Sequence, residues 1–230
     1  MITTSHPSPS LAPAVAPGSA SRIRVVAGAL GAAALTVAAL LVTTPWGDRY
    51  DSGAEEVLDY DGLAAVRDGA WTGMLADGFA FAVLGLTLGL VTCHLVRGRG
   101  RVAALVGALL ATAGGILFAM GGMSFATLTW FASGVSEDVG RPLVDYANDH
   151  TGHLLGATMA GFFLFTVGGL VLATALFRAR AVPVAGVSAY VLLVVAQFAP
   201  VPGRTLDYLQ IAMMALFVAL AVKVLRRPAA

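Results

Sequence analysis

Two polar side chains stand in segments that are otherwise apolar enough to cross a membrane. Asp77 lies early in one such segment, and His153 begins another that carries no further charge before Arg178. An acid in a membrane-spanning helix costs about 2.5–3.5 kcal/mol at the bilayer centre, and less toward the surface. Asp77 could bind a proton or a cation if it faces the interior of a helix bundle. Alternatively, its carboxylate reaches the outer headgroups or accepts hydrogen bonds from a neighbouring helix.

A second candidate site contains His150, His153 and Asp149. Residues three or four apart share one face of a helix, so these side chains could supply two or three metal ligands. The His-Glu-x-x-His motif of metalloproteases is absent, and no cysteine lies nearby in the sequence. The alternative is a helix that starts here, capped by Asn148 or Asp149, with both histidines at the membrane surface.

Asp77 and His153 also invite comparison, because each follows a Thr-Gly pair. Their depths would differ by about 4.5 Å if the two helices started level. If those helices also touched, the carboxylate would stabilise the protonated imidazole. The two residues would then form a proton site or a structural bridge.

No cofactor is predicted, and the sequence does not predict an enzyme. Haem between helices needs axial ligands at matching depth, and His94 has no such histidine partner. The single cysteine, Cys93, is typical of a small buried apolar residue. No Ser-His-Asp set, phosphate-binding loop or pair of intramembrane carboxylates can be assembled from the sequence.

Composition indicates which elements would position these residues. Of 230 residues, 58% are hydrophobic and 12% are charged, whereas soluble domains carry about 25% charged residues. The sequence predicts an all-α, polytopic transmembrane bundle, and its length accommodates six crossings of about 20 residues. A disordered cytoplasmic tail (1–21) would precede a single six-helix domain (22–230). The predicted helices span residues 25–45, 72–96, 102–123, 150–177, 182–199 and 206–225. Outer loops are predicted at 46–71, with a short surface helix, and at 124–149.

Charge is sorted along the chain. Every charged residue at the predicted inner ends is basic, and the outer segments hold nearly all of the acids. Short cytoplasmic loops carry an excess of Lys and Arg, so both termini are predicted to be cytoplasmic. Abundant Arg, Ala, Val and Gly favour a bacterial plasma membrane. The lipid bilayer is the predicted partner, and nucleic acid is excluded because no long basic face is present. The inner basic residues are Arg22, Arg24, Arg97, Arg99, Arg101, Arg178, Arg180, Lys223, Arg226 and Arg227.

Short repeats suggest how the helices are paired. Leu58-Asp59-Tyr60, Val144-Asp145-Tyr146 and Leu206-Asp207-Tyr208 each precede a helix that ends in basic residues. This spacing predicts three helical hairpins, although so short a match also arises by chance. Gly85-x-x-x-Gly89 and Gly152-x-x-x-Gly156 predict close helix–helix approach.

The second half resembles a family of uncharacterised six-helix bacterial membrane proteins, classified as a domain of unknown function. The resemblance spans about residues 149–225. It rests on Gly152-His153-Leu154-Leu155-Gly156, on the run from Leu176 to Pro183, and on the last helix from Tyr208 to Lys223. It implies a topology and no activity.

Two classes of function stay open. The first is a small transporter or a proton- or cation-coupled carrier that uses Asp77 and His153. The alternative is a non-catalytic membrane partner or sensor subunit that uses its acidic outer loops. A homo-oligomer or an unknown membrane partner is compatible with both. A water-lined cavity that reaches Asp77 would favour the first class, and a dry, closed bundle the second.

Overall fold

The computed structural model describes residues 18–43, 58–65, 67–199 and 203–226. These residues form eight α-helices and, within the described ranges, no strand. The helices are α1 (Gly18–Thr43), α2 (Tyr60–Ala65), α3 (Arg67–Leu95), α4 (Arg101–Ala132), α5 (Glu137–Asp149), α6 (Thr151–Arg178), α7 (Val184–Ala196) and α8 (Gly203–Leu225). The predicted tail up to residue 17 and the predicted loop from 46 to 57 lie outside the described residues.

Five of these helices are long and apolar enough to cross a membrane, namely α1, α3, α4, α6 and α8. The chain is therefore a multi-pass integral membrane protein, and the prediction of an all-α helix bundle is confirmed. Helix α7 is apolar but only 13 residues long, which is about 20 Å. A hydrocarbon core of about 30 Å needs a longer helix. The count of six crossings therefore stays a prediction.

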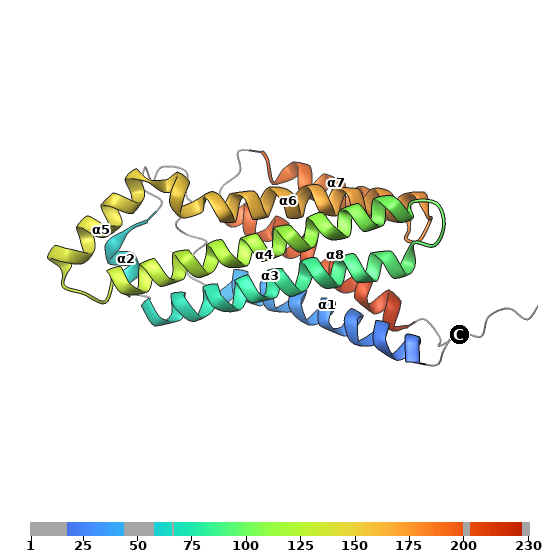
Figure 1. Ribbon diagram of the computed structural model, residues 1–230, viewed down its shortest axis with the longest axis horizontal. Coiled ribbons are helices and arrows are strands. Elements are labelled where there is room, and N and C mark those ends of the chain that lie inside the picture. The colour runs from blue at the N-terminus through green and yellow to red at the C-terminus, as the bar shows by residue number, and fades with distance from the viewer. Residues whose placement is uncertain (1–17, 44–57, 66, 200–202, 227–230) are drawn as a thin grey trace, which may run out of the picture.

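The bundle has two unlike ends (Figure 1). We call one the basic end, defined by the turns at Arg97–Arg101 and Arg178–Arg180 and by the last residues of α8. The other is the cap end, where α2 and α5 lie across the tips of the long helices. The first described residues of α1 also lie at the basic end.

Two helices are longer at the cap end than predicted. Helix α3 begins at Arg67 instead of residue 72, and α4 continues to Ala132 instead of residue 123. The segment after residue 123 was predicted to belong to an outer loop, but it extends α4 by more than two turns. The predicted outer loop at 124–149 consists mostly of these turns and of α5.

Helix α4 is the centre of the packing, because it contacts α3 along one side and α6 along another. Gly107, Gly114 and Gly121 recur every seven residues and face α6. Gly161 and Gly168 of α6 lie opposite them, so the two backbones meet without side chains between them. Small residues permit this approach, and the close packing replaces the hydrophobic effect that is missing in lipid.

The glycine motif predicted in α3 works in the same way. Cβ atoms on Gly85 and Gly89 would collide with Ala111 and Ala108 of α4, so this prediction is confirmed. The motif at Gly152 and Gly156 is not a packing motif: within the described part of the chain, nothing lies within 4 Å of a Cβ at either position.

On the other side of α3, helices α1 and α8 run side by side. A Cβ on Gly31 of α1 would lie 3.5 Å from the Ala221 Cβ of α8. Helix α7 is packed more loosely, at the margin of the bundle against α6 and α8. The fold is thus a tight three-helix core of α3, α4 and α6, with an α1–α8 pair on one side and α7 at the edge.

Candidate functional site

Asp77 lies on the interior face of α3. It shares a heptad stripe with Leu84 and Val91, and both of these are fully buried. Its own side chain is half-buried, and it makes no hydrogen bond or ion pair with any residue that the structure describes. Asp77 lies about 27 Å along the helix from Leu95 at the basic end, which is close to the thickness of the hydrocarbon core. The carboxylate is therefore near the cap-end boundary of the membrane, facing the bundle.

His153 is exposed on α6. It does not lie at the same depth along the bundle as Asp77. Helix α4 lies between α3 and α6, which approach each other at only a few positions. One of these is the edge-on contact of the Phe81 and Phe165 rings, whose centroids are 5.7 Å apart. Measured along each helix from that contact, Asp77 is about 6 Å and His153 about 18 Å toward the cap end. The two residues therefore differ in depth by about 12 Å, and not by the predicted 4.5 Å.

The predicted metal ligands lie at the junction of α5 and α6. The His150 ring stacks on Tyr146 at 4.2 Å, and its Nδ1 is 2.8 Å from the Tyr146 carbonyl oxygen. The rings of His150 and His153 are 6.3 Å apart, and both residues are exposed, as is Asp149. Across the described ranges, no group of three His, Cys, Asp or Glu side chains is placed to hold a metal ion.

The alternative prediction at this junction was correct in part. Helix α6 does begin here, with His150 at its N-cap position. Asn148 does not cap it, because the Asn148 amide accepts the Leu58 N–H and donates to the Leu58 carbonyl oxygen, both at 2.9 Å. This pair of hydrogen bonds fastens the chain before α2 to the end of α5.

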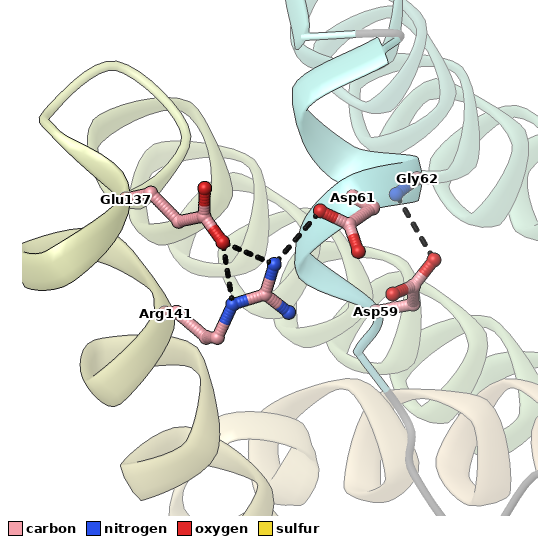
Figure 2. A network of polar contacts seen from close by, with 5 residues as sticks. All are labelled: Asp59, Asp61, Gly62, Glu137 and Arg141. Carbon is pink, nitrogen blue, oxygen red and sulfur yellow. Dashed lines mark hydrogen bonds and ion pairs between the residues drawn. The ribbon is translucent and has the colours of Figure 1, made fainter.

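Charged side chains complete the cap. The Arg141 guanidinium donates to Glu137 at 2.7 Å and to Asp61 at 2.9 Å, and thereby joins α5 to α2 (Figure 2). It also lies over the Tyr60 ring, 5.0 Å from its centroid. The hydrogen bonds to Glu137 and Asp61 raise the pKa of Arg141 above its ordinary value, so the guanidinium stays charged at any physiological pH.

The cap is also anchored to the bundle. Arg67 Nε donates to the Trp130 carbonyl oxygen at 3.0 Å, and the guanidinium stacks 3.9 Å from the Trp130 ring centroid. The indole N–H of Trp130 donates to Asp68 at 3.0 Å. The start of α3 and the end of α4 are thus held together. These contacts join residues more than 60 positions apart, so no local sequence pattern indicates them.

A cavity of about 170 Å³ lies between α3, α6, α7 and α8 in the half of the bundle nearer the basic end. Its lining is apolar except for Tyr190 of α7 and Lys223 of α8. Asp77 is not among the lining residues, so this is not the water-lined cavity at Asp77 that would favour a carrier. Neither Tyr190 nor Lys223 was predicted to form a site, and Lys223 was noted only as one of the inner basic residues. The available signal was that each is a polar residue in an apolar stretch of its helix.

Comparisons with known proteins do not assign the chain to a family. No protein-family model matches the chain, and no match was found among curated proteins or solved structures. The resemblance of residues 149–225 to uncharacterised six-helix membrane proteins therefore stays a prediction.

Proposed function

We propose that the protein is a small proton- or cation-coupled carrier of the bacterial plasma membrane, with Asp77 as its coupling site. The observation that carries this proposal is the placement of Asp77 on an interior helix stripe without a hydrogen-bond or ion-pair partner in the described residues. A carboxylate so placed gains stability by binding a proton or a cation. Ionisable residues in membrane helices are characteristically functional.

The packing supports a moving part. Helices α3, α4 and α6 form a core with glycine contacts too close to slide, whereas α7 has few neighbours and a cavity on its inner side. A carrier needs one element that shifts against a fixed one to change access between the two sides. In this proposal the core is fixed and α7 moves.

Topology follows from charge. The basic end would be cytoplasmic, because Arg97, Arg99, Arg178 and Arg180 lie in short turns there. Helices α6 and α8 both end at the basic end, so the chain must return toward the cap end between them. We propose that α7 and the residues after it make this return as the sixth crossing, which leaves both termini cytoplasmic. This arrangement agrees with the resemblance to six-helix membrane proteins.

The test of Asp77 uses dicyclohexylcarbodiimide, an apolar reagent that attacks protonated carboxyl groups in membranes. Mass spectrometry of the reconstituted protein should find Asp77 modified, with a yield that falls as pH rises. Asp77→Asn should remove this label. Asp207→Asn changes an acid in another membrane-spanning helix and should leave the labelling of Asp77 unchanged. Protection by Na⁺ at constant ionic strength would identify a cation, and its absence a proton. An Asp77 that never reacts would contradict the proposal.

A second candidate function is favoured by the outer face of α5. Val139, Leu143 and Tyr146 form an exposed apolar stripe there, flanked by the exposed acids Asp138 and Asp145. Such a stripe fits a non-catalytic subunit that binds a basic partner protein on the cap side. Crosslinking from a photoreactive residue at position 143 in cells, with position 163 on the bundle as the control, would detect that partner.

A further inference from the structure

The cavity beside α7 has the size and lining of a site for an apolar group. Its volume of about 170 Å³ is close to the roughly 150 Å³ of an engineered apolar cavity that stays dry and binds benzene. Leu172 and Leu176 of α6, Val187 of α7 and Leu220 of α8 supply apolar walls. Pro183 and Ala219 also line it and are exposed, so the cavity opens on the surface between α7 and α8. That surface faces the bilayer.

Tyr190 gives the cavity a hydrogen-bond donor with no acceptor. The residue is 7% exposed, and its hydroxyl lies where a side chain on Gly169 would begin. Of the residues that the structure describes, none makes a hydrogen bond with this hydroxyl. Its oxygen is not among the fully buried atoms without a partner, so it borders the open space of the cavity and can donate to an oxygen atom of a ligand there.

Lys223 gives the cavity a positive charge at the basic end. Its ammonium donates to the Ala181 carbonyl oxygen at 2.7 Å, which uses one of its three N–H groups. The exposed side chains of Arg178, Arg180 and Arg226 surround this end of the bundle. The remaining donors of Lys223 suit an anionic head, because basic residues at the membrane surface attract acidic lipids.

We propose that this cavity binds an anionic glycerophospholipid. The first carbons of one acyl chain occupy the space between α6, α7 and α8, and the rest of the chain lies in the bilayer. The phosphate lies at Lys223, and an ester carbonyl accepts a hydrogen bond from the Tyr190 hydroxyl. The site goes beyond the proposed carrier function and does not depend on Asp77. Occupation by a lipid would hold the loosely packed helix α7 against the core.

Native mass spectrometry of the detergent-solubilised protein tests the proposal. Titration with dioleoyl phosphatidylglycerol is compared with dioleoyl phosphatidylcholine, which has the same chains and no net charge. We expect the anionic lipid to bind about fivefold more tightly, the effect of one basic residue at a membrane surface. Lys223→Gln should abolish this preference for the anionic lipid. Tyr190→Phe should weaken the binding of both lipids. Arg99→Gln removes a basic charge that does not line the cavity. It should change neither the affinity for the two lipids nor the preference for the anionic one.

A second variant fills the cavity without disturbing its walls. Nothing described lies within 4 Å of a Cβ on Gly186, which lines the cavity, so Gly186→Leu should occupy the space and prevent binding. Gly156→Leu is the matched control, since that glycine is also unobstructed but lies elsewhere on the surface. Asp77→Asn should bind lipid as the native protein does.

Three results would overturn the proposal. Unchanged binding in Gly186→Leu would mean that the lipid binds elsewhere. If Lys223→Gln still preferred the anionic lipid, the phosphate would not bind at Lys223. Tighter binding of oleate, with the same dependence on the variants, would assign the cavity to a free carboxylic acid.

Discussion

Gly114 of α4 and Gly161 of α6 face each other with no side chain between them. A Cβ on Gly161 would lie 2.8 Å from the Gly114 carbonyl oxygen, closer than real Cβ contacts allow. Gly107 and Gly168 make a similar contact two turns away. The two backbones are therefore in close contact at successive turns, which fixes the register of α4 against α6 in this structure.

Gly161→Ala should destabilise the protein by about 1–3 kcal/mol, as overpacking of a close contact typically does. Thermal unfolding in detergent measures this change. Gly156→Ala is the control, because that position is open and alanine is the better helix former by up to about 1 kcal/mol. Equal melting temperatures for the two variants would contradict the packing described for α4 and α6.

The helices were predictable from sequence, but their contacts were not. Long apolar runs bounded by arginine at one end predicted α3, α4 and α6. Two Gly-x-x-x-Gly motifs were predicted to permit close approach, yet only Gly85 and Gly89 meet a neighbouring helix, whereas Gly152 and Gly156 are open. The motif indicates only that another helix could approach this one closely. Whether a partner lies there depends on the tertiary arrangement, which a local pattern does not contain.

Arg141→Gln should release α2 from α5, because it removes both ion pairs of the cap. Hydrogen exchange of the α2 amides, such as Leu63 N–H, should become several-fold faster. The hydrogen bonds to Glu137 and Asp61 raise the pKa of Arg141, so only strong base would discharge the guanidinium. Asp145→Asn on the same helix should leave the exchange unchanged. Unaltered exchange in Arg141→Gln would show that apolar packing alone holds α2.

Asn148→Asp should also loosen the cap, although the change is nearly isosteric. The carboxylate can still accept the Leu58 N–H, but it cannot donate to the Leu58 carbonyl oxygen and repels it. The loss of one such hydrogen bond costs about 0.5–1.5 kcal/mol. Faster exchange of the Leu58 amide would reveal it. Asp149→Asn, at the exposed next residue, is the control. Equal exchange of the Leu58 amide in both variants would contradict the role of the Asn148–Leu58 hydrogen bonds.

Cysteine labelling tests the proposed topology, in a variant that lacks Cys93. Cysteines at Asp138 and Arg204 should react with an impermeant maleimide added to intact cells, whereas those at Arg99 and Ala179 should not. The positions 179 and 204 flank α7, so their difference reports whether the chain crosses there. Labelling at Arg99 from outside would contradict the assignment of the basic end, and equal labelling at 179 and 204 would contradict a sixth crossing.

The candidate site was predicted in part. Asp77 was recognisable because a carboxylate in an apolar helix is costly, and its interior stripe agrees with that interpretation. The pairing with His153 required the relative depth of two helices, which the sequence leaves undetermined. Tyr190 was passed over, and Lys223 was noted only as an inner basic residue, because their shared role depends on the cavity that α6, α7 and α8 enclose.

The depth difference between Asp77 and His153 leads to a last prediction. If an imidazolium contacted Asp77, it would hold the carboxylate ionised and keep it from reacting with dicyclohexylcarbodiimide. His153→Gln would then increase the labelling of Asp77. Because α4 lies between the two helices and the residues are about 12 Å apart in depth, we expect the labelling to stay the same over the whole pH range. An increase in His153→Gln would contradict the register set by Phe81 and Phe165 and would restore the pair as a proton site.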